Sequence, residues 1–465
     1  MPVKPTLPSP TATLTRVALD CVLSPAQVLG ILAQREPLPF ALSGNWSGGG
    51  AIVGADPLRV AADTEDPFAL LDALPPVEPH VDGPTGGPVS IGGGWFGWLG
   101  YRLAARVERI PLNAHRPVAL PDFHLAYYDN VLRRTPDGRW WFEALVTDAR
   151  RDALEQRRRH LAALLSGPAP ITPPPPGISE LHLSAHDAEH HLDAVAQCRE
   201  RIAAGEIFQA NLCLRLHGET DASATDLFAA ALGHVDPPYG AAFATPRGGI
   251  ASLSPELFVC RRARHIVTGP IKGTIARDPD PAVAAAALDT LRGSVKDAAE
   301  HVMIVDLMRN DLGRVCEYGT VLAPRRPTAE PHPGLWHLVS HVHGRLRPEV
   351  TDADVLRATF PPGSVTGAPK VQSLRVIAEL EATGREVYTG AIGFASPVAG
   401  LELNVAIRTL ELADGHVWLG AGGGIVADSD PRTELEEALT KARPIAAAVG
   451  STVDVQRRAL ATRAA

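Results

Sequence analysis

Short apolar runs separated by turn residues fill most of the chain, and this pattern predicts a protein rich in β-strands. Residues 249–260 and 265–271 are two such runs, dominated by Ile, Leu, Phe and Val. The basic segment 261–264 between them predicts a hairpin. A hairpin brings Glu256 and Lys272 to the same end of one sheet, where they form either an ordinary surface ion pair or part of a site.

Further apolar runs predict more strands of the same kind. They are residues 51–53, 123–132, 140–146, 207–216, 336–342, 388–394, 401–412 and 416–422. The turn residues 135–138 predict a second hairpin. Glycine alternates with aromatic residues over 92–101, which predicts strands whose backbones approach closely.

Helical spacing of apolar residues predicts the other elements. The segment 184–187 resembles a capping box, so a helix begins there and ends at Gly205. The remaining predicted helices are residues 150–165, 281–312, 371–381 and 431–449. Six prolines within 167–177 predict a linker. The chain is therefore divided into an N-terminal part, 1–165, a linker, 166–181, and a C-terminal part, 182–455.

Composition excludes several classes of protein. The 465 residues are 45% hydrophobic and 21% charged, with a formal net charge of -8, so a basic surface for nucleic acid is not expected. No apolar run reaches the ~18 residues that a membrane span needs. The first fifteen residues lack the apolar centre of a signal peptide. Five cysteines without a Cys-x-x-Cys pair favour a reduced, cytoplasmic location.

Two predicted helices each carry two acids and one lysine on one face. These are Lys296, Asp297 and Glu300 on the first and Glu434, Glu437 and Lys441 on the second. Oxygen ligands from two helices suit a hard cation such as Mg²⁺. Two solvent-exposed sets of ion pairs are the alternative.

The loop 360–370 precedes a predicted helix and does not match a phosphate-binding Walker motif. Lys370 follows Pro369, and no Ser or Thr comes after it. Ser364 and Thr366 at the start of a helix still suit an anion.

Several ordered motifs together resemble the chorismate-utilising enzyme family. The strings are GEIFQAN (205–211), SPE (254–256), PIKGT (270–274), EHVMIVDL (300–307), RNDLGRV (309–315), GSVTGAPK (363–370), YTGAIG (388–393), AIRT (406–409) and GGGIV (422–426), followed by Glu434, Glu437 and Lys441. The resemblance is dense from about residue 184 to 449. It implies one α/β (α+β) unit, in which two large antiparallel sheets pack together with helices outside. The N-terminal residues would contribute strands to the same sandwich.

The resemblance also implies roles for individual residues. Glu300 and Glu437 would bind Mg²⁺ directly, and Asp297 and Glu434 would bind it through water. The metal would hold the ring carboxylate of chorismate. Eight positions would form the substrate pocket: Arg408, Tyr388 and the amides of Gly422, Gly423 and Gly424 at the enolpyruvyl carboxylate, with His337, Thr274 and Lys441 lining the ring.

Two positions point to a branch of the family. Isochorismate and salicylate synthases carry a Lys that activates water where Gln209 stands. Anthranilate synthases typically have Ala where Lys272 stands, whereas aminodeoxychorismate synthases have Lys. The resemblance therefore implies that Lys272 attacks C2 of chorismate while Glu256 assists departure of the C4 hydroxyl, and that ammonia then replaces Lys272 by adding at C4. His301 departs from the Asn of many relatives.

Partners follow from what the chain lacks. No amidotransferase Cys-His-Glu set or pyridoxal phosphate site is recognisable, so the resemblance implies a glutamine amidotransferase subunit that supplies ammonia, with 4-aminobenzoate and folate downstream. Ser43 and the turn 237–239 stand where relatives bind tryptophan, and an ordinary loop and turn is the alternative. Two other functions stay open: an anthranilate synthase, and a non-catalytic protein that senses chorismate, which would need no nucleophile.

Overall fold

The computed structural model describes residues 10–78, 89–118, 120–167, 177–278, 280–324, 326–332 and 335–455. The side chains of Thr274 and Asp297, two of the predicted site residues, lie outside the described part of the protein. So do residues 168–176, which make up most of the predicted linker.

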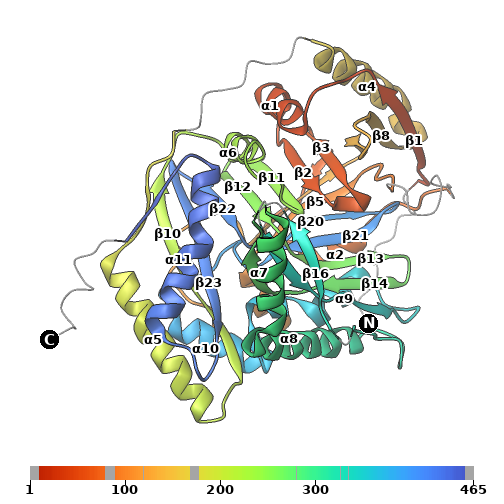
Figure 1. The fold of residues 1–465 in the computed structure, drawn as a ribbon. Coiled ribbons are helices and arrows are strands. Elements are labelled where there is room, and N and C mark those ends of the chain that lie inside the picture. Colours follow the sequence, from red (N-terminus) through yellow and green to blue (C-terminus); the bar gives the residue numbers. More distant parts are fainter. Residues whose placement is uncertain are drawn as a thin grey trace.

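Two large sheets form the centre of the molecule (Figure 1). The large sheet has 13 strands among the described residues and the second sheet has 8. In spatial order the large sheet contains β1 (Thr13–Leu19), β8 (Trp140–Val146), β7 (Asn130–Arg134), β3 (Gly50–Gly54), β2 (Phe40–Gly44), β11 (Tyr239–Thr245), β12 (Gly248–Ser254), β22 (Thr409–Ala413), β23 (His416–Ile425), β10 (Gln209–Glu219), β9 (Leu181–Leu183) and β24 (Val453–Val455), with β19 (Gly367–Ala368) paired to β10. The second sheet contains β18 (Val342–Arg345), β14 (His265–Gly269), β13 (Leu257–Arg262), β21 (Gly400–Val405), β20 (Ala391–Ser396), β5 (Gly94–Leu99), β6 (Phe123–Tyr128) and β4 (Arg59–Val60). Nearly all neighbouring strands are antiparallel; β9 and β24 are parallel.

A third, small sheet and the helices complete the fold. The small sheet contains β15 (Ile271–Ala276), β17 (Leu335–Val339) and β16 (Thr328–His332). The α-helices are α1 (Pro25–Arg35), α2 (Pro67–Asp72), α3 (Ala104–Val107), α4 (Arg151–Leu165), α5 (Ala185–Ala203), α6 (Ala224–Ala231), α7 (Pro281–Gly293), α8 (Val295–Gly313), α9 (Asp352–Thr359), α10 (Lys370–Leu380) and α11 (Pro431–Ala448). Short 3-10 turns include η1 (Trp46–Gly48) and η4 (Gly363–Val365).

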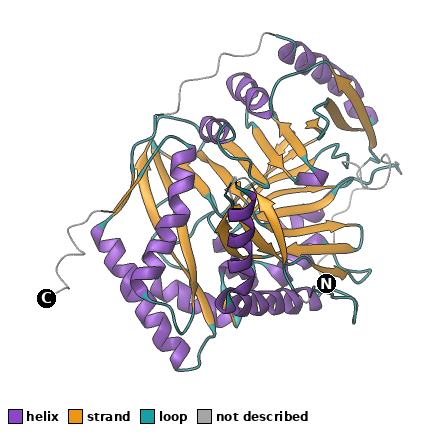
Figure 2. Cartoon of the chain, viewed as in Figure 1, coloured by secondary structure: helices purple, strands orange, loops and turns teal. Residues whose placement is uncertain are grey.

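Most of the hydrophobic core among the described residues lies in three layers that the two sheets separate, and a fourth, smaller cluster lies between β10, α5 and α10. An aromatic layer fills the space between the sheets and includes Trp98 and Phe394. A second layer lies between the large sheet and α1, α4, α6 and α11. A third lies between the second sheet and α2, α8 and α9. The helices are therefore on the outside and the strands within (Figure 2), which confirms the predicted sandwich.

Strand alternation explains this layering. In β20, Phe394 faces the aromatic layer and the next residue, Ala395, faces the helices. Successive strand residues point to opposite faces, so a strand covered on both sides is apolar throughout. Strands from before and after residues 168–176 pair directly, as β2 does with β11 and β5 with β20.

Several element predictions are confirmed. The Ser184 side chain caps α5 by accepting from the Asp187 amide. The hairpins β7–β8 and β13–β14 form as expected. Helices α4, α10 and α11 lie within a residue or so of their predicted bounds.

Other predicted elements were too long, because they cross from one sheet to another. The run 249–260 divides into β12 and β13, which belong to different sheets. The runs 401–412 and 123–132 divide in the same way, into β21 and β22 and into β6 and β7. The run 336–342 divides into β17 and β18. Apolar residues continue through each crossing because both sheets are buried, so periodicity does not mark the change.

The predicted helix 281–312 is two helices, α7 and α8. The chain leaves helical geometry at Ser294, whose φ and ψ are -69° and 110°. Gly293 and Ser294 are poor helix formers, which accounts for a break at this point. Among the described residues, no helix combines the length and the apolar character that crossing a membrane requires.

We expect Gly97→Ala to destabilise the fold by more than ~2 kcal/mol. Gly97 of β5 lies between Leu125 and Gly393 on the neighbouring strands, and a Cβ atom there would overlap the carbonyl oxygen of His124. The free energy of unfolding from urea titration measures this. The control is Gly30→Ala in α1, where a Cβ meets nothing within 4 Å and the change should stabilise by ~0.5–1 kcal/mol. Equal stabilities for the two variants would contradict the close approach.

Candidate active site

Two neighbouring strands change sheet at the same place, and the candidate residues gather there. The segment 254–256 comprises the last residue of β12 and the two residues that lead to β13, and the segment 406–408 connects β21 to β22. Because β12 pairs with β22 and β13 with β21, the two segments lie side by side; we call them the seam. The Val405 amide donates to the Glu256 carbonyl at 3.0 Å. Glu256 and Arg408 are thus on adjacent segments of the seam.

Glu256 is a carboxylic acid buried among donors. Its side chain is 4% exposed. Burial raises its pKa to about 7, against the opposing effects of a hydrogen bond from Ser364, the Lys272 ammonium, the Ile271 amide and Arg408. A carboxyl group with this pKa can both give and accept a proton near neutral pH, as general acid–base catalysis requires.

The hairpin pairing of Leu257 with Gly269 brings the segment before Lys272 close to Glu256. The predicted shared sheet was wrong, because the chain passes after Gly269 from β14 of the second sheet to β15 of the small sheet, which carries Lys272. Burial lowers the pKa of Lys272. Glu300 opposes this shift, Lys441 adds to it, and Glu256 and Glu437 oppose it. The amine is therefore more readily deprotonated than an exposed lysine.

The glycines of β23 leave room for two polar side chains. A Cβ atom on Gly424 would overlap Nε2 of Gln209 and lie 3.6 Å from Nζ of Lys272. Gln209 is 1% exposed, and its Oε1 has no hydrogen-bond partner among the described residues. The structure thus brings Gln209 and Lys272 together at Gly424.

The next residue along β23 faces the predicted acidic cluster of α11. A Cβ atom on Gly423 would lie 3.2 Å from Glu434 Oε2, 3.6 Å from Glu437 Oε1 and 3.7 Å from Lys441 Nζ. Nζ of Lys441 is 2.8 Å from Glu437 Oε1 and donates to the Gly422 carbonyl at 3.0 Å. Three of the predicted residues on α11 are therefore gathered at the glycine strand.

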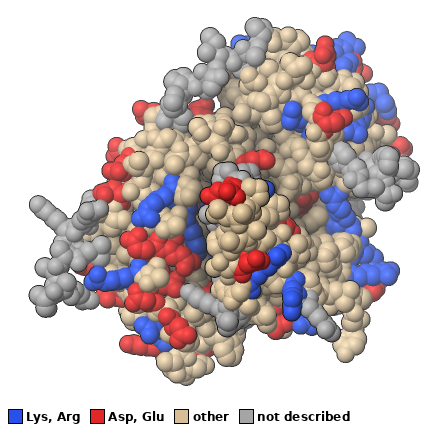
Figure 3. Space-filling view, viewed as in Figure 1, with Lys and Arg blue, Asp and Glu red and all other residues tan. Residues whose placement is uncertain are grey.

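The carboxylates suit a hard cation by their chemistry. Glu300 of α8 and Glu437 of α11 both act on the ammonium of Lys272, so the two helices direct negative charge at one cation. Acidic side chains also gather over α5 and α11 on the face in Figure 3. Within the described part of the chain, no three His, Cys, Asp or Glu side chains converge as a metal site. The donor set fits Mg²⁺ in kind, and Mg²⁺ binding stays a prediction.

Tyr388 and His337 are buried near these groups. A Cβ atom on Gly420 of β23 would overlap the Tyr388 ring, and the Tyr388 hydroxyl is 3.7 Å from the Cys213 thiol. Burial raises the pKa of Tyr388 well above its usual value, so the phenol stays protonated. His337 is 1% exposed and pairs with Thr274 across β15 and β17, two residues beyond Lys272.

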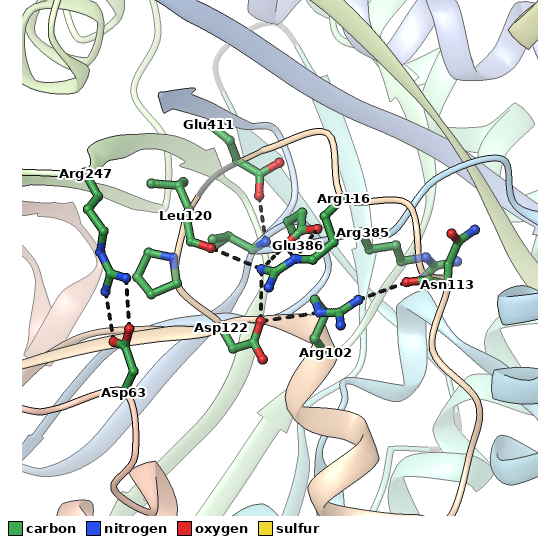
Figure 4. A network of polar contacts seen from close by, with 12 residues as sticks. Asp63, Arg102, Asn113, Arg116, Leu120, Asp122, Arg247, Arg385, Glu386 and Glu411 are labelled. Atoms are coloured by element: carbon green, nitrogen blue, oxygen red, sulfur yellow. Dashed lines mark hydrogen bonds and ion pairs between the residues drawn. The ribbon is translucent and has the colours of Figure 1, made fainter. Parts of the chain in front are cut away.

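Ion pairs from the N-terminal part hold the segment before Tyr388 (Figure 4). Arg116 pairs with Glu386 at 2.6 Å. The amides of Val387 and Tyr388 donate to Glu411 at 2.6 and 3.1 Å. Residues far from Tyr388 in the sequence therefore set its position, and no local motif identifies them.

The region predicted for tryptophan contains a tryptophan of the chain itself. Ser43 pairs with Gly240 across β2 and β11. The Trp46 indole N–H donates to the Gly240 carbonyl at 2.9 Å, and its ring meets Tyr239 edge-on at 5.3 Å. Binding of free tryptophan near Ser43 stays a prediction.

Comparison with known proteins agrees with this geometry. Residues 17–447 match the family of chorismate binding enzymes. The chain belongs to the chorismate-binding enzyme family. It is 36% identical over 455 residues to anthranilate synthase component 1 of Streptomyces coelicolor, covering 93% of this chain and 87% of that protein. It is also 36% identical over 396 residues to aminodeoxychorismate synthase component 1 of Klebsiella aerogenes, covering 84% and 82%.

A solved structure extends the comparison to the fold. The crystal structure of anthranilate synthase component I from Streptococcus pneumoniae superimposes with a TM-score of 0.71 at 27% identity, covering 96% of this chain and 94% of that one. Chorismate-binding enzymes with two different names are thus equally similar in sequence. Identity by itself does not decide between their reactions.

Sequence reasoning did not identify Ser364 as a residue that lowers the pKa of Glu256 against the effect of burial. The motif string 363–370 contained Ser364, but the loop was interpreted only as an anion site at a helix start. The motif string was the one signal in the sequence that could have pointed to Ser364.

We expect Gly424→Ala to weaken chorismate binding at least ~tenfold, a loss of ~1.4 kcal/mol. The added methyl group would overlap Gln209 and reach toward Lys272. Isothermal titration calorimetry with chorismate and Mg²⁺ measures the affinity. Gly313→Ala at the end of α8 is the control, because a Cβ there meets nothing within 4 Å. Unchanged affinity in Gly424→Ala would remove Gly424 from the site.

Proposed function

We propose that this chorismate-binding enzyme is an aminodeoxychorismate synthase component I, which converts chorismate and ammonia to 4-amino-4-deoxychorismate. The observation that carries the proposal is the pair formed by Lys272 and Glu256. Burial moves the pKa of the amine down and that of the carboxyl up to about 7. Both shifts favour a neutral nucleophile beside a protonated acid.

The first step forms a bond between the Lys272 nitrogen and C2 of the ring. The two ring double bonds shift toward C4, and the C4–O bond breaks. Glu256 gives its proton to the departing hydroxyl, which leaves as water. This step leaves Glu256 ionised and the ring attached to a positively charged lysine nitrogen.

The second step reverses the path with ammonia. Ammonia forms a bond to C4, the double bonds shift back, and the C2–N bond breaks to release the neutral amine of Lys272. The Glu256 carboxylate takes a proton from the new C4 ammonium and is ready for another cycle. Two displacements restore the configuration at C4 that one displacement would invert. Covalent catalysis of this kind divides one difficult step into two easier ones.

Other residues would hold the substrate. Arg408, Tyr388 and the Gly422–Gly424 amides would bind the enolpyruvyl carboxylate, while His337, Thr274 and Lys441 would line the ring. Glu300 and Glu437 would hold Mg²⁺, with Asp297 and Glu434 acting through water. When bound, the ion neutralises the ring carboxylate. Each of these assignments follows the family resemblance.

Gln209 supports amination over addition of water. Its buried Oε1 lacks a partner among the described residues, so it is an acceptor suited to an N–H group of ammonia or of Lys272. A lysine at this position would add a second ammonium beside Lys272. Ammonia would come from a glutamine amidotransferase subunit, and the product would serve 4-aminobenzoate and folate synthesis.

Anthranilate synthase is the second candidate, favoured by the 36% identity to the Streptomyces coelicolor protein of that name. The reaction product distinguishes the two. Purified protein is incubated with chorismate, Mg²⁺ and ammonium, and the products are separated by chromatography. We expect 4-amino-4-deoxychorismate, whereas 2-aminobenzoate would support the second candidate and overturn the first.

We expect Lys272→Ala to lower formation of the 4-amino product by about three orders of magnitude or more, because the nucleophile is lost. Product chromatography and intact-protein mass spectrometry with chorismate alone measure turnover and the lysine adduct. Arg309→Ala is the control, since Arg309 pairs with Asp306 on the exposed side of α8. Full ammonia-dependent activity in Lys272→Ala would exclude a covalent role for Lys272.

We expect a chelator to abolish turnover and added Mg²⁺ to restore it. Glu437→Gln should weaken Mg²⁺ binding at least ~tenfold, measured by calorimetry with the metal alone. Glu436→Gln is the matched control, because Glu436 is the preceding residue of α11 and pairs instead with Arg443 at 3.2 Å. Equal Mg²⁺ affinity for the two variants would remove Glu437 from the metal site.

A further inference from the structure

We propose that His301 is a positioning residue for Lys272: through a buried hydrogen bond to Ser340 it fixes the point from which the strand that carries Lys272 begins. The inference rests on the proposed function, in which the amine of Lys272 is the nucleophile. The hydrogen bond itself needs no substrate. Nε2 of His301 lies 2.6 Å from Oγ of Ser340, and the two residues are 3% and 1% exposed.

Ser340 lies where two paired strands pass together from the second sheet to the small sheet. In the second sheet β14 pairs with β18, and in the small sheet β15 pairs with β17. Pro270 joins β14 to β15, and residues 340–341 join β17 to β18. The Ser340 amide donates to the Pro270 carbonyl at 3.3 Å, so the two connections lie side by side. We call this place the crossing at Pro270; it is two residues from Lys272.

The crossing at Pro270 depends on a side chain for part of its support. Proline has no N–H, so Pro270 cannot return the hydrogen bond that it accepts from Ser340. The side chain of Ser340 bonds instead to the imidazole of His301 on α8. The preceding residue of that helix is Glu300, the predicted metal ligand. The bond between His301 and Ser340 therefore ties the helix of the predicted metal ligand to the strand of the nucleophile.

Lys272 stands on an irregular part of β15, so its direction depends on how the strand is held on both sides. The register of β15 with β17 shifts between Ile271 and Thr274, and Gly273 in this interval has a φ of 83°. Irregularities of this kind in a strand commonly redirect a side chain at a site. Regular pairing with β17 holds the strand from Thr274 onward. The side before Lys272 is the crossing at Pro270.

Packing alone does not explain a histidine at position 301. Nδ1 of His301 is buried and has no hydrogen-bond partner among the described residues, which is unfavourable for a polar atom. Burial lowers the pKa of His301, and the main chain of Lys272 opposes that shift. An apolar side chain would fill the same space without an unpartnered atom. The bond from Nε2 to Ser340 is thus the contact that accounts for the imidazole.

Loss of this bond should affect the first chemical step more than substrate binding. Without it the crossing at Pro270 is held less firmly, and the amine of Lys272 loses its alignment with C2 of the ring. A displacement of ~1 Å at a reacting group can slow a reaction about a hundredfold. We therefore expect the bond between Lys272 and C2 to form ~10- to 100-fold more slowly. Binding of chorismate should change little, because other groups hold it.

The test compares Ser340→Ala and His301→Leu with the wild type, each as the full chain. Intact-protein mass spectrometry with chorismate and Mg²⁺ measures the rate of the lysine adduct, and calorimetry measures the affinities for chorismate and for Mg²⁺. We expect slower adduct formation at unchanged affinities. Ser340→Thr keeps the hydroxyl and His301→Gln keeps a polar nitrogen at similar reach, so each should recover most of the rate. Ser396→Ala is the control, because Ser396 is equally buried and donates instead to the Ile91 carbonyl at 2.8 Å.

The double variant shows whether the two residues act through one bond. If they do, Ser340→Ala combined with His301→Leu slows adduct formation no more than the slower single variant. Effects that multiply would overturn the proposal. A matching loss of Mg²⁺ affinity in His301→Leu would also overturn it, because His301 would then act through Glu300.

A further measurement does not depend on the reaction. Hydrogen–deuterium exchange of peptides that cover residues 270–276 is followed without substrate. We expect faster exchange in Ser340→Ala and His301→Leu and wild-type exchange in Ser340→Thr; equal exchange in all of them overturns the proposal. If the wild type forms neither the adduct nor the 4-amino product, the proposed function fails, while exchange still decides whether His301 holds this strand. If both variants form the adduct at the wild-type rate, only the inference about His301 is wrong.

Discussion

The site depends on two neighbouring strands that pass from one sheet to the other at the same place. A strand that leaves its sheet loses its ladder partners, and buried backbone groups need replacements. Here each crossing uses the other: the Leu253 amide donates to the Arg408 carbonyl at 2.9 Å, and the Ser254 hydroxyl donates to the Val405 carbonyl at 2.6 Å. The crossings therefore stabilise one another and fix Glu256 between apolar layers. Its high pKa follows from that burial.

Missing side chains are as important as those present. The glycine strand β23 runs between Gln209 and Lys272 on one face and the acids of α11 on the other. Any Cβ on Gly424 would occupy the space where Gln209 meets Lys272. Glycine in a strand costs conformational entropy. The three consecutive glycines of β23, Gly422–Gly424, are therefore explained by the space that they leave for other groups and not by a gain in stability. The site gains backbone amides and room for a ligand at the expense of local packing.

Opposite charges alternate across the site. Glu300, Glu256 and Glu437 each favour the charged form of Lys272, while Lys441 pairs with Glu437. Such an arrangement lets burial shift a carboxyl up and an amine down without leaving either unpaired. Buried ion pairs outside this set, such as Arg385 with Glu381 at 2.7 Å, hold the walls in place. The charged residues assigned to the reaction are thus different from the ion pairs that hold the surrounding segments in place.

The sequence determined most element types and the motif residues. The capping box at Ser184, the hairpins and the amphipathic pattern of α11 are local signals, and each gave a correct element. The tertiary structure decided where strands change sheet, because an apolar run has the same sequence pattern whichever of the two buried sheets it joins. It also divided the predicted helix 281–312 into two helices at Ser294, where the helix propensity of the sequence is low.

For the site, the sequence placed Glu256 and Lys272 at one end of a hairpin, since antiparallel pairing follows from the order of runs. It did not give the direction of either pKa shift, because burial depends on layers formed by distant residues. It did not reveal the hydrogen bond that Arg385 donates to the Val365 carbonyl, which joins residues 20 positions apart. The sequence by itself determined the chemical groups and their local order, and the packing of two sheets decided their protonation and their partners, because both depend on desolvation at the seam.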